Sequence, residues 1–235
     1  MSLNNSQQNS EQIKQAKPNR EQLAAALLLY GVTDRSWLNG RSLAEQVEEA
    51  VKGGATFIQL REKDLDYDTF LREAFVIKEV CRKYNVPFVI NDNVDVALAA
   101  DADGVHVGQE DMAAGLVRSK LGEDKILGVS AQTVEQAVLA EQNGADYLGV
   151  GAVFSTSTKL DADAVSFETL QNICNSVKIP VVAIGGINRE NIPQLSGSGV
   201  VGVAVVSAIF AAENAAEAAA QLKQQTLTMV QKMQK

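Results

Sequence analysis

The sequence is short of the residues that would mark a secreted or disulfide-stabilised protein. It has two cysteines, Cys81 and Cys174, in 235 residues. Two cysteines cannot build the disulfide framework of a small secreted domain. Both lie in segments with a helical pattern, so we expect two buried thiols and a reducing compartment.

Long apolar runs are also lacking. No stretch is apolar enough to span a membrane, and the first 20 residues are rich in Asn, Gln and Ser, without the apolar centre of a signal peptide. We therefore expect a cytoplasmic protein with a loosely ordered leader at residues 1–22 and one catalytic domain at residues 23–235. Chains of this length often form a single α/β barrel.

Positive charge is scarce as well. The net charge is −8, and the sequence contains no long basic run. This excludes nucleic acid and anionic membrane as main partners and favours small-molecule substrates. An anionic substrate would be attracted by local cations, and a homo-oligomer remains open.

Short Val/Ile-rich runs recur along the chain and alternate with helical patterns. Near-continuous apolar runs are typical of parallel strands buried on both faces. The predicted strands are Leu27–Val32, Thr56–Leu60, Phe88–Ile90, Gly104–Val107, Ile126–Val129, Tyr147–Val150, Val181–Ile184 and Val200–Val205.

The segments between these strands predict eight helices. They are Leu43–Lys52, Thr69–Tyr84, Asn93–Ala100, Met112–Lys120, Val134–Gln142, Phe167–Ser176, Arg189–Leu195 and a last one from about Ala215 to Gln234. Eight strands alternating with eight helices predict a closed (β/α)8 TIM barrel, an α/β fold. Most polar candidate residues follow directly after a predicted strand, which is where barrel enzymes build their active sites.

Two aspartates follow consecutive strands, Asp92 after Asn91 and Asp111 after His106-Val-Gly-Gln-Glu. Each precedes a helical pattern, so three roles are open: a helix N-cap, half of a general acid–base pair, or a metal ligand. The nearby cations favour ionised carboxylates. Mg²⁺ is typically held by one or two carboxylates together with substrate phosphates.

Basic and hydroxyl side chains follow two other strands. Arg61 and Lys63 are two residues apart and would point the same way from an extended strand end, either onto a diphosphate or into solvent. The segment Thr156-Ser-Thr-Lys159 lies in a long loop, and loops of that length inside a barrel are usually functional. A hydroxyl-rich turn that ends in lysine favours phosphate.

The last two strands are followed by Gly185-Gly186 and by Val206-Ser207. In many barrels these two loops form a phosphate site, where glycines let backbone N–H groups approach the anion. The single histidine, His106, lies inside a predicted strand, which favours a packed, structural histidine over a general base.

Seven motifs in this order and spacing resemble the thiamine phosphate synthase family. They are Gln59-Leu-Arg-Glu-Lys63, Asn91-Asp92, His106-Val-Gly-Gln-Glu-Asp111, Gly128-Val-Ser130, Thr156-Ser-Thr-Lys159, Gly185-Gly-Ile187 and Val206-Ser207. The resemblance covers Leu27 to about Phe210.

The resemblance implies an enzyme that joins 4-amino-2-methyl-5-(hydroxymethyl)pyrimidine diphosphate to 4-methyl-5-(2-hydroxyethyl)thiazole phosphate and releases diphosphate. It also implies roles for the motif residues. The pyrimidine diphosphate would be bound by Gln59, Leu60, Arg61, Glu62, Lys63, Asn91, Ser130 and Lys159, of which Arg61, Lys63, Ser130 and Lys159 are the catalytic candidates. The thiazole phosphate would be bound by Thr156, Ser157, Thr158, Gly186, Val206 and Ser207, and one Mg²⁺ per site by Asp92 and Asp111.

In the implied reaction, diphosphate leaves first and the thiazole nitrogen captures a pyrimidine carbocation. That nitrogen already has a lone pair, so no general base is needed, and stabilising the leaving group by metal and cations is the main demand. Two positions depart from the family pattern: Ser155 stands where proline is frequent, and Gln132 where related tautomerases carry histidine.

Two other functions remain as hypotheses. One is an isomerase or tautomerase acting on a phosphorylated heterocycle at the same phosphate site, without Mg²⁺. The other is a catalytically silent sensor of thiamine phosphate built on the same barrel. The absence of histidine at position 132 argues against the tautomerase, and the presence of Asp92, Asp111 and Lys159 argues against the sensor.

Overall fold

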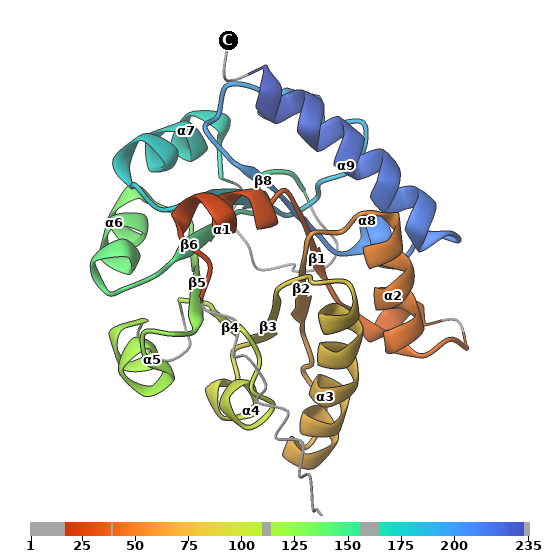
Figure 1. Cartoon of the computed structure of the whole chain (residues 1–235). Coiled ribbons are helices and arrows are strands. Elements are labelled where there is room, and N and C mark those ends of the chain that lie inside the picture. Colours follow the sequence, from red (N-terminus) through yellow and green to blue (C-terminus); the bar gives the residue numbers. More distant parts are fainter. Residues whose placement is uncertain (1–16, 39, 110–113, 156–164, 233–235) are drawn as a thin grey trace, which may run out of the picture.

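The fold is a closed barrel of eight parallel strands surrounded by helices, which confirms the predicted (β/α)8 architecture (Figure 1). The computed structural model describes residues 17–38, 40–109, 114–155 and 165–232. The strands are β1 Leu29–Val32, β2 Phe57–Leu60, β3 Phe88–Asn91, β4 Gly104–Val107, β5 Ile126–Ala131, β6 Tyr147–Val150, β7 Val181–Ile184 and β8 Gly202–Val205. Strand β8 pairs with β1, which closes the barrel.

The helices of the described part are α1 Arg20–Ala26, α2 Leu43–Gly53, α3 Tyr67–Lys83, α4 Val94–Ala99, α5 Ala114–Leu121, α6 Val134–Gln142, α7 Phe167–Ser176, α8 Ser207–Phe210 and α9 Ala215–Gln231, with 3-10 turns η1 Arg35–Trp37 and η2 Ile192–Leu195. Several begin at a polar residue whose side chain accepts a hydrogen bond from the first turn, such as Ser42, Thr133 and Ser166. These caps fix where each helix starts after its loop.

One predicted helix is replaced by a shorter element. The segment Arg189–Leu195 forms only the 3-10 turn η2. Pro193 lacks an N–H, which suits a first turn, and the following Gly197 and Gly199 adopt left-handed φ angles of 87° and 96° that end any helix. The connection from β7 to β8 therefore contains a 3-10 turn in place of an α-helix.

The sequence pattern also missed α1, which lies across the amino-terminal end of the barrel (Figure 1). Its cap is Asn19, and the helix begins inside the segment predicted as a leader. Leu23 and Leu27 are buried and belong to the same cluster as the barrel interior. Helix α1 therefore closes the bottom of the barrel, opposite the rim where the candidate site residues lie.

Two apolar cores result. The larger one lies between the strands and the surrounding helices. The smaller one fills the barrel with Tyr30, Val32, Phe57, Val89, Ile126, Tyr147, Val182 and Ala204, above Leu23 and Leu27. The interior is therefore packed with side chains and is not a channel, as expected for an eight-stranded barrel.

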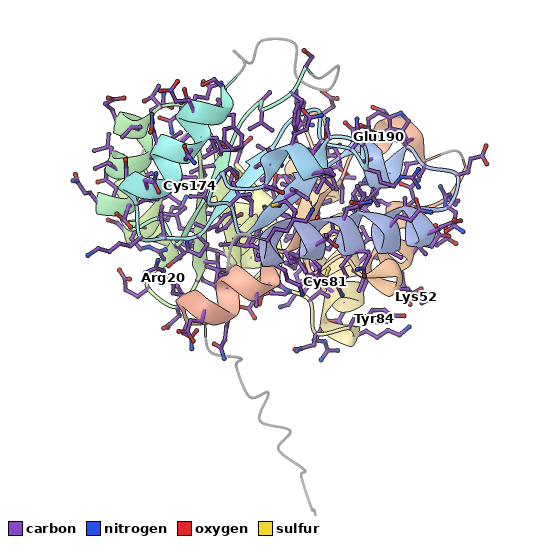
Figure 2. The ribbon with its side chains drawn as sticks, turned by 90° about the horizontal axis from the view of Figure 1, so that it is seen from above. Arg20, Lys52, Cys81, Tyr84, Cys174 and Glu190 are labelled. Atoms are coloured by element: carbon purple, nitrogen blue, oxygen red, sulfur yellow. The ribbon has the colours of Figure 1, made fainter. Side chains whose placement is uncertain are left out.

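The sequence predicted two buried thiols, which the structure confirms for Cys81 and only in part for Cys174. Cys81 in α3 is buried and Cys174 in α7 is half-buried, and neither is in a disulfide. Figure 2 shows them on separate sides of the molecule. Burial raises the pKa of the Cys174 thiol to about 12, so this side chain is not a reactive thiolate at neutral pH.

The closing role of α1 can be tested with Leu23→Ala. Removing this buried side chain leaves a cavity beneath the barrel interior, so we expect the free energy of unfolding to fall by about 2–4 kcal/mol. Leu139→Ala in α6, where the leucine is 59% exposed, is the matched control and should change it by less than about 0.5 kcal/mol. Urea unfolding measures both. Equal effects would contradict a closing role for α1.

Candidate active site

The candidate site residues meet at the carboxyl ends of the strands. Those within the described residues lie at or just after the carboxyl ends of β2, β3, β5, β7 and β8, and parallel strands in a closed barrel direct all five ends to one rim. Asp111, Thr156, Ser157, Thr158 and Lys159 lie outside the described residues. The geometry below therefore concerns the remaining candidates.

The last two side chains of β2 point to opposite faces of the barrel wall. Gln59 points into the barrel and is only 4% exposed, whereas Leu60 packs in the outer core against the helices. Only the backbone of Leu60 remains for a substrate contact. Beyond the strand, the Arg61 backbone N–H donates to Thr33 Oγ1 at 3.0 Å, and its guanidinium lies 4.0 Å from the Asp34 carboxylate. The loop after β1 thus supports Arg61.

Glu62, which follows Arg61, is held by Arg35 of the loop after β1. Arg35 Nε lies 2.6 Å from Glu62, and another nitrogen of the same guanidinium lies 2.5 Å from Glu73 in α3. Burial raises the pKa of Glu62, and the charge of Arg35 opposes this rise. The carboxylate of Glu62 is therefore engaged by Arg35, and this contact braces the loop that carries Arg61 and Lys63.

Asp92 has an unusual backbone conformation at the end of β3. Its φ angle is 60°, in the left-handed region, and its N–H donates to the His106 carbonyl at 2.8 Å. Two other non-glycine residues with positive φ, Asn85 and Asp101, follow the C-cap residues of α3 and α4, where such a conformation ends a helix. Asp92 follows a strand instead, and strained residues of this kind cluster at functional sites.

The structure also decides against one of the roles left open for Asp92. The N-cap of α4 is Asn93, whose side chain accepts from the Val96 N–H at 2.9 Å. Asp92 is thus not the helix cap. Its exposed carboxylate accepts a hydrogen bond from Asn91 Nδ2 and borders a cavity of about 360 Å³ that Lys63 also lines.

The composition of this cavity suits a phosphorylated ligand with Mg²⁺. Its lining residues include Asp92 and Lys63, together with Asp95 and Lys120, which form an ion pair at 2.6 Å. Within the part of the chain that the structure describes, no three or more His, Cys, Asp or Glu side chains form a metal-binding group. Mg²⁺ needs only one or two carboxylates when phosphates and waters complete its shell, so Asp92 fits as a ligand.

Ser130 lies at the end of β5 beside the only histidine. Its Oγ is 3.0 Å from His106 Nε2, and its carbonyl accepts from Gln109 Nε2 at 2.5 Å. His106 is 8% exposed and lies inside β4, as the sequence predicted. The His106 ring reaches Ser130 on the neighbouring strand β5 because Gly128 on β5 and Gly149 on β6 leave space for it.

The loops after β6 and β7 are in close contact. Gly186 has a φ angle of 65°, and a Cβ atom there would collide with the carbonyl oxygen of Ser155. The Phe154 N–H donates to the Gly185 carbonyl at 3.1 Å, which joins the two loops. Near them, Ser207 begins the four-residue helix α8 after β8 and is exposed, with Val206 half-buried beside it.

Comparison with known proteins gives one consistent result. The sequence pattern described as thiamine monophosphate synthase matches residues 29–209. Thiamine-phosphate synthase of Clostridium tetani is 52% identical over 194 residues, which cover 83% of this chain and 93% of that protein. The protein of the same name from Ruminiclostridium cellulolyticum is 54% identical, with 83% and 92% covered.

A solved structure agrees. Thiamine phosphate pyrophosphorylase from Pyrococcus furiosus superposes with a TM-score of 0.82 at 41% identity, covering 88% of this chain and 99% of that one. The chain belongs to the thiamine monophosphate synthase family. The resemblance found in the sequence is thus confirmed, and the chain is an enzyme of the transferase class.

More distant barrels share only the fold. A 3-hexulose-6-phosphate synthase superposes with a TM-score of 0.60 at 19% identity.

Within the described residues, no helix is both long and apolar enough to cross a membrane.

Sequence reasoning missed the tyrosines of the barrel interior. Tyr30 and Tyr147 lie in β1 and β6, within apolar runs, and read as ordinary core residues. Their hydroxyl groups meet at 2.8 Å inside the barrel, and Gln59 and His106 contact them. The only signal in the sequence was the placement of polar atoms inside buried strands, since buried hydroxyls require partners.

The contact between the β6 and β7 loops predicts the effect of two substitutions on the apparent KM for the family's thiazole phosphate. Gly186→Val should raise it more than Ser207→Ala, for which about 5- to 10-fold corresponds to one lost hydrogen bond. Gly197→Val is the matched control, because Gly197 has a similar φ of 87° but open space around it. Steady-state kinetics with varied thiazole phosphate measures all three. A fall in kcat alone would contradict this placement.

Proposed function

We propose that the chain condenses 4-amino-2-methyl-5-(hydroxymethyl)pyrimidine diphosphate with 4-methyl-5-(2-hydroxyethyl)thiazole phosphate to give thiamine phosphate and diphosphate. The family membership supports this reaction. The observation that carries it in the chain itself is the cavity after β2 and β3, which Lys63 and Asp92 both line. A neutral substrate would not need this arrangement of charges.

In this proposal the cations of the β2 loop bind the departing diphosphate. Arg61 binds with its planar guanidinium and Lys63 as a point charge, and Asn91 adds amide hydrogen-bonding groups. Lys159 completes this set. The negative charge on the diphosphate grows as the C–O bond breaks, so these groups stabilise the transition state more than the bound substrate.

One Mg²⁺ per site, held by Asp92 and Asp111, would neutralise charge on the diphosphate as a Lewis acid. The second substrate, thiazole phosphate, would be bound by a separate set of residues. Thr156, Ser157, Thr158, Gly186, Val206 and Ser207 would bind the thiazole phosphate and place its ring nitrogen beside the pyrimidine. Orienting the two rings in this way is itself a large part of catalysis.

The proposed chemistry needs no proton to be removed from the thiazole nitrogen. His106 is consistent with that, since it is buried and engaged by Tyr147 and Ser130. We also place the enzyme in the cytoplasm, where phosphorylated substrates occur and where free thiols such as Cys81 and Cys174 remain reduced.

Release of diphosphate on mixing both substrates tests the reaction and its metal dependence together. We expect turnover with Mg²⁺ and none in excess EDTA. Asp92→Asn should raise the Mg²⁺ concentration needed for half-maximal rate at least about tenfold, since even indirect partners of a metal change its affinity roughly 10–100-fold. Full activity in EDTA would exclude the metal role, and no diphosphate release would exclude the synthase.

Asparagine is chosen because it also tolerates a left-handed backbone, so only the charge is lost. Asp101→Asn is the matched control. Asp101 has a φ of 49° but lies after α4 at the opposite end of the barrel, and its change should leave the Mg²⁺ requirement unaltered.

Lys159→Ala should lower kcat and kcat/KM together by about 10²–10³-fold, as does the loss of a group that acts on charge formed in the transition state. Lys52→Ala is the control, since Lys52 lies at the outer edge of α2 in an exposed pair with Glu48 (Figure 2).

The order of bond breaking can be tested with an electron-poor pyrimidine substrate. Because the proposed route places positive charge on the pyrimidine ring, this substrate should slow single turnovers far more than it weakens binding. Nearly equal rates would favour direct displacement by the thiazole nitrogen.

A further inference from the structure

A continuous chain of hydrogen bonds crosses the barrel interior between two candidate substrate-binding residues. Gln59 Nε2 on β2 donates to the Tyr30 hydroxyl on β1. The Tyr30 and Tyr147 hydroxyls are 2.8 Å apart, Tyr147 lies 3.0 Å from His106 Nδ1, and His106 Nε2 lies 3.0 Å from Ser130 Oγ. The three residues in the middle of this chain have no role in the reaction as proposed above.

The interior is shaped around this chain. Tyr30, Tyr147 and His106 are at most 8% exposed, and the Tyr30 and Tyr147 rings pack edge to face on Phe57. A Cβ atom at Gly128 would collide with both the Tyr147 ring and His106. The rings therefore have little freedom to turn, and the hydroxyls have little choice of partner.

The hydrogen atoms of the chain can be assigned from its donor end. Burial raises the pKa of both tyrosines well above its ordinary value, so each phenol stays neutral and supplies one hydrogen. Tyr30 accepts from the Gln59 amide and so gives its hydrogen to Tyr147. Tyr147 then gives its own to His106 Nδ1.

This assignment fixes the state of the histidine. With Nδ1 accepting, the neutral ring carries its hydrogen on Nε2 and donates it to Ser130 Oγ. The hydrogen of the Ser130 hydroxyl is then directed away from His106, toward the rim. At the other end, the Gln59 amide is fixed with Oε1 left to accept.

We propose that Tyr30, Tyr147 and His106 are positioning residues that hold His106 as the Nε2–H tautomer, so that the Ser130 hydroxyl donates to an acceptor atom of the pyrimidine diphosphate. The role in substrate binding rests on the proposed function, because Ser130 and Gln59 are taken to contact that substrate. The tautomer itself does not depend on any function.

The opposite polarity is the competing arrangement. A Gln59 amide turned by 180° would accept from Tyr30, and every hydrogen in the chain would reverse. His106 would then carry its hydrogen on Nδ1, and Ser130 would donate to Nε2, which leaves its oxygen able only to accept from a substrate. The two arrangements place the ring hydrogen on different nitrogens and are therefore distinguishable.

The first measurement is nitrogen NMR of untagged protein labelled with ¹⁵N-histidine. The chain has one histidine, so its two ring nitrogens are assigned without ambiguity. We expect protonated Nε2 and bare Nδ1 in the wild type, and loss of this single tautomer in Tyr147→Phe. Protonated Nδ1 in the wild type would overturn the proposal without any variant having to fold.

The second measurement is kinetics of Tyr147→Phe. We expect kcat/KM for the pyrimidine diphosphate to fall about tenfold, the effect of one misdirected hydrogen bond, with the KM for thiazole phosphate unchanged. In a Ser130→Ala background the same change should have little further effect, because Tyr147 acts through Ser130. Tyr84→Phe is the control, because Tyr84 lies at the C-terminal end of α3 (Figure 2), where its hydroxyl donates to Glu48 of α2.

The outcomes separate the two ideas. Unchanged kinetics of folded Tyr147→Phe, or an equal loss in the Ser130→Ala background, would overturn the positioning role. Absence of diphosphate release by the wild type would overturn the proposed function, while the NMR result would still decide the tautomer.

Discussion

The pairing of β8 with β1 is the constraint on which the site depends. It closes eight parallel strands into one barrel, so that residues far apart in sequence leave the sheet at the same rim. Gln59, Asn91, Ser130 and Ser207 belong to four such strand ends. The same closure creates an interior too narrow for water-filled space, and this interior must be packed from within. The polar chain that ends at Ser130 exists because some of that packing is done by tyrosine and histidine.

Strand order and strand position could be predicted because both depend on local pattern. Val/Ile-rich runs separated by glycine-containing turns are visible without any knowledge of contacts, and all eight predicted strands occur with small shifts at their ends. The exceptions depend on tertiary context. Helix α1 follows a polar segment and is stabilised by what Leu23 and Leu27 contact beneath the barrel. The segment ending at Leu195 has a helical pattern, but Pro193 removes a backbone donor and Gly197 adopts a left-handed φ just after it.

The candidate site was predictable as a set of residue types and positions, but not as a set of contacts. That Asn93 and not Asp92 caps α4 depends on a backbone angle that a sequence pattern does not contain. The role of Arg35 in holding Glu62 and Glu73 joins three elements that are far apart in sequence. This pair of contacts matters electrostatically. Arg35 offsets negative charge at Glu62, next to Arg61 in sequence, which helps a chain with a net charge of −8 to present cations to an anionic substrate.

The burial of the single histidine, His106, is consistent with the proposed chemistry. In the proposed reaction, diphosphate leaves and a nitrogen lone pair attacks, so no general base is needed. A histidine beside the substrate is then free of the requirement to exchange protons with water, and it can be buried among Tyr147, Gly128 and Ser130. Burial limits solvent as a competing partner, and the ring nitrogens contact Tyr147 and Ser130. An imidazole in that setting serves as a rigid link between strands, and its value lies in which nitrogen keeps the hydrogen.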